Sequence, residues 1–189
     1  MYPHIVHCHI IHYFKKKPAM ISKALIFATQ CHENQVRRGS NLPYIVHPIA
    51  VASNVRAYCH TKNLTALMTA ALLHDVVEDC KVTIQEIAQK FGEEVGHLVL
   101  ELTSYPAEIE KMGKTRYLKE KMINMSDDAL MIKLCDRLDN VRDYRNIEPE
   151  SERAQEYFNS TREILEYLSL SRNMNSVHVL LSSDILRLC

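Results

Sequence analysis

Apolar residues recur at helical spacing in segment after segment of this sequence, and this periodicity constrains the fold more than any other feature. The clearest case is the stripe of Leu130, Leu134, Leu138 and Val141, which places four apolar side chains on one helix face. Ser126 and the two aspartates after it form a typical helix start. Only 4 glycines and 6 prolines are present, which disfavours a turn-rich all-β sandwich. We therefore predict an all-α protein.

The same pattern predicts several further helices and two loops. Thr83 and Glu86 form a capping box at the start of a short helix. The other predicted helices cover Ile21–Cys31, His47–Val55, Leu64–Asp79, Glu93–Leu102, Ser126–Tyr144, Glu150–Leu168 and Asn175–Leu188. The polar stretches QVRRGSNLP and Ser104–Gly113 are predicted to be loops. Because neither a repeat nor a linker interrupts the chain, we expect one domain, a helical bundle over residues 19–189.

The first 18 residues carry His4, His7, His9 and His12 and are predicted to form a poorly ordered extension. Their lysines follow the apolar stretch, which is the wrong order for a secretory signal. No apolar run approaches the ~20 residues that cross a bilayer. The 6 cysteines are scattered and form no CxxC pair, so we interpret them as reduced thiols. These features predict a cytoplasmic protein without a membrane partner.

The net charge excludes one class of function. Lys and Arg total 23, as do Asp and Glu, so the formal charge is zero. No global positive field exists to hold nucleic acid. Any phosphate chemistry must therefore depend on a local cluster of charges.

A polar cluster ends the apolar segment Leu64–Asp79. The sequence LLHDVVED places His74, Asp75, Glu78 and Asp79 within about one and a half helical turns. Three carboxylates at a helix C-terminus repel one another and oppose the helix dipole, which costs about 1–2 kcal/mol. A divalent cation compensates such repulsion, and imidazole with carboxylate suits Mn, Fe or Zn. Taken alone, the four residues fit a solvated acidic helix end equally well.

Two more segments carry polar residues among apolar ones. In IKLCDRLDN, Asp136 and Asn140 lie four residues apart, and a carboxylate buried there needs a partner. In PYIVHPIAV, His47 stands alone among apolar residues. A single histidine in such a run is more often a core residue than a metal ligand. The three segments are therefore informative only in combination.

In combination, His47, then His74 with Asp75, then Asp136 have the order found in the HD metal hydrolases, a family that this sequence resembles. The segments HENQVRRGSNLPYIVHPIAVA, AALLHDVVED and KLCDRLDN resemble the hydrolase domain of the RelA/SpoT alarmone enzymes. The sequence QEYF and the single-domain length resemble the small stand-alone alarmone hydrolases. The resemblance covers about Ile21 to Leu168.

The resemblance implies an HD-type helical bundle in which one divalent metal, usually manganese, is held by His47, His74, Asp75 and Asp136. It implies hydrolysis of the 3′-pyrophosphate of guanosine tetra- or pentaphosphate, which gives GDP or GTP and pyrophosphate. Since the chain ends before a synthetase domain could begin, we expect degradation of this nucleotide and not its synthesis.

The resemblance also assigns roles around the metal. Glu78 and Asp79 match the catalytic acidic pair, and two carboxylates just beyond the ligand pair are free for acid/base work. The residues that match substrate contacts are Arg37, Arg38, Asn140, Arg153 and Tyr157. Asp139 departs from the family pattern, because the long enzymes tend to have histidine there, in DRLHN.

Other functions remain compatible with the sequence. A metal-dependent phosphatase of another nucleotide, such as NADPH, needs similar metal and ribose geometry. A non-catalytic nucleotide sensor keeps a structural metal without depending on Glu78. Nucleic-acid binding through Arg37 and Arg38 is disfavoured by the zero net charge. We therefore expect a small nucleotide as the partner, and the sequence does not define an oligomeric state.

Overall fold

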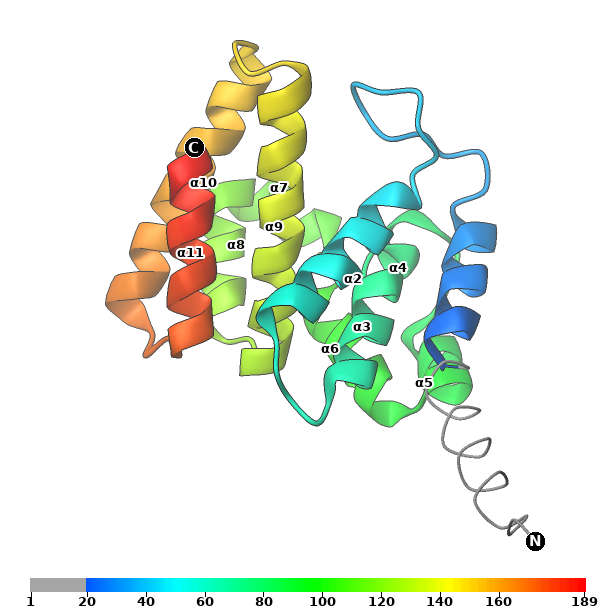
Figure 1. The fold of residues 1–189 in the computed structure, drawn as a ribbon. Coiled ribbons are helices and arrows are strands. Elements are labelled where there is room, and N and C mark those ends of the chain that lie inside the picture. Colours follow the sequence, from blue (N-terminus) through cyan, green and yellow to red (C-terminus); the bar gives the residue numbers. More distant parts are fainter. Residues whose placement is uncertain (1–19) are drawn as a thin grey trace, which may run out of the picture.

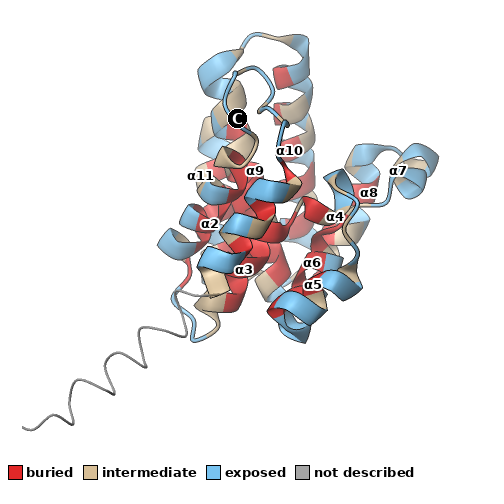
Figure 2. Ribbon diagram, turned by 90° about the vertical axis from the view of Figure 1, so that its right-hand side faces the viewer, coloured by how far each residue is buried: buried red, intermediate tan, exposed pale blue. Residues whose placement is uncertain are grey.

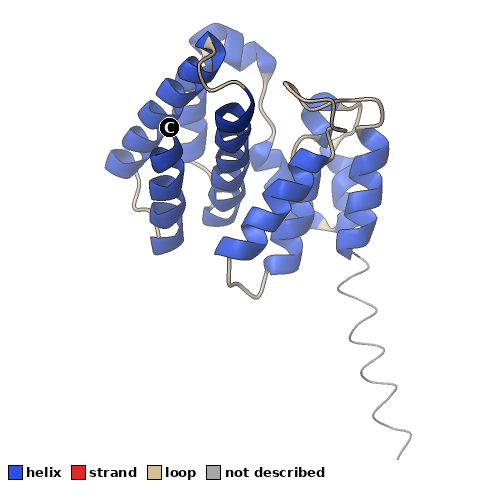
Figure 3. Cartoon of the chain, turned by 45° about the horizontal axis from the view of Figure 1, so that its top comes forward, coloured by secondary structure: helices blue, strands red, loops and turns tan. Residues whose placement is uncertain are grey.

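The computed structural model describes residues 20–189. The His-rich extension predicted over residues 1–18 lies outside the described residues. Within them the secondary structure is helical, apart from an isolated β-bridge between Val36 and Pro43 (Figure 3). The prediction of an all-α fold is confirmed.

The helices follow one another through short connections, and the first covers residues 20–31. The others are α2 (Val46–Tyr58), α3 (Leu64–Leu73), α4 (Val76–Asp79), α5 (Ile84–Phe91), α6 (Glu93–Leu102), α7 (Pro106–Met112), α8 (Lys114–Ile123), α9 (Asp127–Ile147), α10 (Glu152–Ser171) and α11 (Ser176–Leu188). Among these described helices, none combines the length and the apolar character that a membrane span requires.

The helices pack around a continuous apolar core. α2 packs against α3 and α9, α6 packs against α3, α5 and α9, and α10 and α11 cover another side of α9 (Figure 1). Buried residues lie on the inward faces of these helices, whereas α7 projects from the edge of the bundle and has no buried residue (Figure 2). The long helix α9 is therefore the element on which both halves of the bundle pack.

The predicted leucine stripe explains why α9 occupies this place. Leu130, Leu134, Leu138 and Val141 are all buried. Ser126 caps the helix by accepting a hydrogen bond from the backbone N–H of Ala129. At 25 cal/mol per Å² of apolar surface, each buried leucine contributes about 2 kcal/mol to the hydrophobic stabilisation. The capping box of Thr83 and Glu86 at the start of α5 is likewise confirmed.

The predicted single helix over Leu64–Asp79 is wrong, because the chain breaks into α3 and α4 at His74 and Asp75. The ring Nδ1 of His74 lies 2.8 Å from the carbonyl oxygen of Ala71, to which it donates a hydrogen bond. A side chain that binds the local backbone competes with the helical ladder. At Asp75 the backbone departs from helical values, with φ −100° and ψ −8°. The break therefore coincides with the polar pair that the sequence analysis singled out.

The predicted loop over Ser104–Gly113 is also wrong, since most of it forms the helix α7. Pro106 occupies the first helical turn, where its missing N–H is tolerated. The segment was assigned to a loop because it is polar, but a short helix at the edge of a bundle needs no buried face. The helix predicted to begin at Glu150 begins instead at Glu152, because Ser151 is its N-cap.

We predict that the close packing of α5 on α6 limits the side chain at Gly96. A Cβ atom there would lie 2.9 Å from the Cβ atom of Ala88, which cannot rotate away. Gly96→Ala should lower the free energy of unfolding by about 1–3 kcal/mol through overpacking, despite the better helix propensity of alanine. Urea denaturation measures this change. Adding Ala88→Gly to the variant should recover part of the loss, and a more stable Gly96→Ala protein would contradict the close contact.

Candidate active site

A cleft of about 770 Å³ opens between the side of the bundle that carries α2 and α4 and the side that carries α8, α9 and α10. Ten of the eleven predicted site residues line it: Arg37, Arg38, His47, Asp75, Glu78, Asp79, Asp136, Asn140, Arg153 and Tyr157. His74, the remaining one, is buried beside this cleft against Asp75. The structure thus gathers residues that are spread over more than half of the chain.

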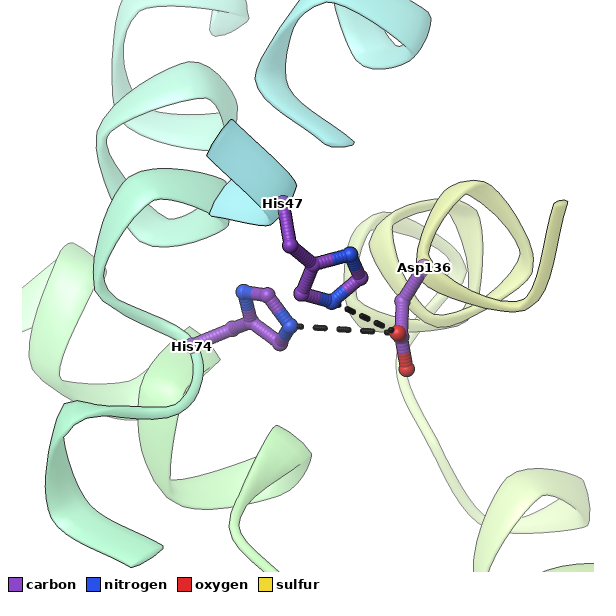
Figure 4. A group of neighbouring side chains, drawn as sticks. All are labelled: His47, His74 and Asp136. Carbon is purple, nitrogen blue, oxygen red and sulfur yellow. Dashed lines mark ion pairs between the residues drawn. The ribbon is translucent and has the colours of Figure 1, made fainter. Parts of the chain in front are cut away.

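Three of the predicted metal ligands form a tight group at the bottom of this region. One donor atom each from His47, His74 and Asp136 lie within 4.8 Å of one another. The Oδ1 atom of Asp136 is 3.2 Å from Nε2 of His47 and 3.9 Å from Nε2 of His74 (Figure 4). The three side chains come from the start of α2, the break between α3 and α4, and the middle of α9.

Asp75 adds a fourth donor to this group. Its Oδ2 atom lies 3.0 Å from Nε2 of His74 and 3.7 Å from Nε2 of His47. The hydroxyl of Tyr44 donates a hydrogen bond of 2.6 Å to the same oxygen. Tyr44 therefore fixes the orientation of the Asp75 carboxylate.

The hydrogen bonds of the two imidazoles leave the correct atoms free for a metal. Nδ1 of His47 lies 2.6 Å from Oδ2 of Asp139 and donates to it, as Nδ1 of His74 donates to Ala71. This tautomer directs the lone pair of each Nε2 toward Asp75 and Asp136. Nε2 of His74 is buried and has no hydrogen-bond partner among the described residues. Two imidazoles and two carboxylates suit a divalent transition-metal ion, so the residues fit such an ion.

When no cation is present, the imidazoles and carboxylates of this group shift one another's pKa values. Burial by itself lowers the pKa of His47, but the hydrogen bonds to Asp136 and Asp139 and the nearby carboxylates outweigh burial and raise the pKa to about 9. For Asp136, burial opposes ionisation, yet Lys133 and the two histidines hold its pKa well below the ordinary value. The Nζ atom of Lys133 lies 2.9 Å from Oδ2 of Asp136. Lys133 and the two histidines thus supply positive charge around the Asp136 carboxylate.

Glu78 and Asp79, the predicted catalytic pair, lie on α4 and line the cleft. The backbone N–H of Ser104 donates a 2.5 Å hydrogen bond to Oε1 of Glu78. Burial raises the pKa of Glu78, and Lys133 offsets part of this effect. Burial and the charge of Asp75 raise the pKa of Asp79. A raised carboxyl pKa suits a group that exchanges protons near neutral pH.

Arg37 and Arg38, both predicted to contact substrate, have different surroundings in the structure. Arg37 donates through Nε to Asp143 at 2.6 Å and through its terminal nitrogen to Asn140 at 2.8 Å. Asn140 in turn donates to Oδ1 of Asp136 at 2.6 Å. Arg38 is exposed on the loop. A chain of hydrogen bonds thus joins Arg37, through Asn140, to Asp136, one of the predicted metal ligands.

Arg153 and Tyr157 lie on α10 and line the cleft from the side of that helix. The Tyr157 ring packs against Tyr144, with centroids 5.0 Å apart, and beneath the guanidinium of Arg137 at 5.0 Å. Both rings line the cleft and add aromatic surface to it.

Three residues of the site were not assigned roles from the sequence: Tyr44, Lys133 and Asp139. Lys133 precedes Asp136 by three residues, and this helical spacing could have revealed the pair. Tyr44 and Asp139 gave no such signal, because their partners lie 31 and 92 residues away in the chain.

An all-α bundle that holds two histidines and two aspartates where its helices meet is the arrangement of the HD domain. Residues 24–169 match the HD-domain family, and the chain belongs to this family.

Within the HD-domain family, the most similar proteins reported below place this chain among the RelA/SpoT-like small hydrolases. A Xenopus tropicalis protein named guanosine-3′,5′-bis(diphosphate) 3′-pyrophosphohydrolase MESH1 is 38% identical over 84% of this chain and 88% of its own length. A probable GTP pyrophosphokinase of Mycobacterium leprae is 37% identical over 87% of this chain but only 20% of its own length. The solved structure of a metazoan orthologue of SpoT that hydrolyses ppGpp superimposes with a TM-score of 0.77, at 32% identity, covering 89% of this chain and 94% of that one. The sequence resemblance is confirmed.

We predict that Asp139 supports metal binding through His47. A carboxylate that accepts from the distal nitrogen of a histidine ligand orients the ring and raises its basicity, and losing it weakens metal affinity about 10–100-fold. Asp139→Ala should show this loss in a competition titration with a chelating dye. Asp143→Ala removes another acidic partner of Arg37 without touching His47 and should bind metal normally. Equal affinities in all three proteins would contradict the role of Asp139.

Proposed function

We propose that this protein hydrolyses the 3′-pyrophosphate of guanosine tetra- or pentaphosphate to GDP or GTP and pyrophosphate. The observation that supports this most is the buried group of His47, His74, Asp75 and Asp136 beside a cleft that also presents a separate acidic pair. Two relatives that match this chain over 88% and 85% of their own length carry the name of that activity.

We propose His47, His74, Asp75 and Asp136 as the ligands of one divalent metal, with manganese as the ion. When bound, the ion supplies Lewis acidity to a water and to a phosphoryl oxygen. Neighbouring residues fix the orientation of the proposed ligands. Asp139 and the Ala71 carbonyl fix the two imidazoles, and Tyr44 fixes Asp75.

Glu78 and Asp79 perform the proton transfers in this proposal. A water oxygen attacks the phosphorus that is bonded to the ribose 3′-oxygen, the bond between this phosphorus and the 3′-oxygen breaks, and pyrophosphate and GDP result. One carboxylate accepts a proton from the water, and a carboxylic acid returns a proton to the 3′-oxygen. The raised pKa values of both carboxyl groups suit this exchange.

The nucleoside is bound at the end of the cleft lined by Arg37, Arg38 and Asn140 in this proposal. A guanidinium stacks on a base or pairs with a phosphate without losing its charge. The hydrogen bond from Asn140 to Asp136 sets the amide beside the metal group, where the ribose of the substrate has to lie. Arg153 and Tyr157 contact phosphate from α10.

The proposal also places the protein in the cytoplasm. The five cysteines of the described residues are free thiols, the state in which a reducing compartment keeps them.

The first test is release of pyrophosphate from guanosine tetraphosphate by chelator-treated protein. We expect GDP and pyrophosphate in equal amounts when manganese is added back, and neither product in its absence. NADPH, assayed for phosphate release in parallel, tests the alternative nucleotide. Phosphate release from NADPH without pyrophosphate from guanosine tetraphosphate would replace the proposed substrate, and inactivity on both with metal bound would favour a nucleotide sensor.

A second test distinguishes the residues proposed to bind the metal from those proposed to transfer protons. Glu78→Gln removes a proton-transfer group but no ligand, so we expect kcat to fall by about 100-fold or more with unchanged metal affinity. Asp75→Asn or His74→Ala should lose metal and activity together. Glu110→Gln, on the exposed helix α7, is the matched control. Normal turnover by Glu78→Gln would show that this residue is not catalytic.

A further inference from the structure

The two ends of the cleft differ in charge and in the residues that line them. Residues along α9 locate these two ends. Lys133, Arg137, Asn140 and Tyr144 all line the cleft from this helix at spacings of three or four residues. Asn140 belongs to the end that carries Arg37. At 1.5 Å per residue, Lys133 lies about 10 Å further along the helix axis, on the other side of the metal ligand Asp136. The proposed nucleoside contacts therefore leave this second end unexplained.

Arg137 directly follows Asp136 on α9, and since helical side chains lean toward the helix N-terminus, we count its guanidinium with the second end. It is only 4% exposed, and one terminal nitrogen donates a 2.7 Å hydrogen bond to the hydroxyl of Thr161. Its Nε has no hydrogen-bond partner among the described residues, and no carboxylate of residues 20–189 forms an ion pair with it. A buried guanidinium without a counter-charge is expensive unless an anion binds it.

The start of α8 brings further anion-binding groups to the same cleft. Lys114 and Thr115 occupy its first turn and line the cleft. The first N–H groups of a ten-residue helix lack helical acceptors and carry partial positive charge. The Thr115 hydroxyl lies 2.9 Å from that of Ser160, which lines the cleft from α10.

The cations at this end are close enough to perturb one another. Burial, Lys133 and Arg137 each lower the pKa of Lys114, and the carboxylates of Asp136 and Glu78 only partly offset them. Lys133 is paired with Asp136, whereas Lys114 forms no ion pair within the part of the chain that the structure describes. The second end thus carries positive charge in excess of its partners.

We propose that Lys114, Thr115, Arg137 and Ser160 form a diphosphate subsite, which binds the 3′-diphosphate of the substrate and the pyrophosphate released from it. The subsite rests on the proposed function. A diphosphate carries several negative charges over two phosphoryl groups, and this end presents two unpaired cations, two hydroxyls and a helix N-terminus. With the nucleoside toward Asn140 and the diphosphate toward Lys114, the bond to be broken lies next to Asp136.

The test is calorimetric titration of inorganic pyrophosphate into the metal-loaded protein at constant free manganese. Lys114 is not part of the apolar core, so Lys114→Ala removes one charge without disturbing that core. We expect its Kd for pyrophosphate to rise about tenfold, as loss of one charge-assisted phosphate contact predicts. Metal affinity should not change. Lys111→Ala, on α7 and outside the cleft, is the matched control and should bind pyrophosphate normally.

Arg137→Gln and Ser160→Ala provide independent variants, with thermal unfolding as a check that the buried position tolerates the change. Both should weaken pyrophosphate binding while metal affinity is retained. Unchanged pyrophosphate affinity in folded Lys114→Ala and Arg137→Gln proteins would overturn the subsite, even if guanosine tetraphosphate is hydrolysed. Weakened binding in a protein that does not hydrolyse guanosine tetraphosphate would support the subsite and reject the proposed function.

Discussion

The structure depends on placing two imidazoles and two carboxylates in the interior of a helical bundle. Such groups are stable there only when each charge is compensated, because isolated buried charges are strongly unfavourable. Without a cation, Lys133 and the raised pKa of His47 provide the compensation around Asp136. A divalent ion can take over this role. Helices α2, α3 and α9 must therefore meet at one point, and the apolar core around them supplies the free energy that holds them there.

The break between α3 and α4 follows from the same requirement. The backbone N–H of Asp79 still donates to the carbonyl oxygen of Asp75, so the two carboxylates remain neighbours and the charge of Asp75 raises the pKa of Asp79. The turn at His74 and Asp75 lets Nδ1 of His74 bond to the backbone and directs the Asp75 carboxylate to Tyr44 and the imidazoles. Asp79 then follows on α4 as a separate group that lines the cleft. One short segment thus supplies two of the proposed ligands and both proposed proton-transfer groups.

Sequence periodicity was sufficient for most helices with a buried face, but it missed α8, whose buried residues are Tyr117, Leu118 and Met122. The leucine stripe of α9 and the capping box before α5 were predicted correctly because their signals lie within a few residues. Periodicity could not reveal the break after Leu73, since both sides of it keep a helical pattern, nor α7, which buries nothing. In the site, motif order placed the predicted ligands together, whereas Tyr44 and Asp139 act through partners that only the folded chain brings near.

Asp139 illustrates how a departure from a family pattern is accommodated. A neutral histidine at this position could accept a hydrogen bond from His47 through one ring nitrogen, but it would offer no negative charge to Arg37. The carboxylate of Asp139 does both, since Oδ2 accepts from Nδ1 of His47 and lies 3.4 Å from a terminal nitrogen of Arg37. Arg37 also binds Asn140, which binds Asp136. Arg37 therefore connects to two of the proposed metal ligands, to His47 through Asp139 and to Asp136 through Asn140, so its position and their geometry are mutually constrained.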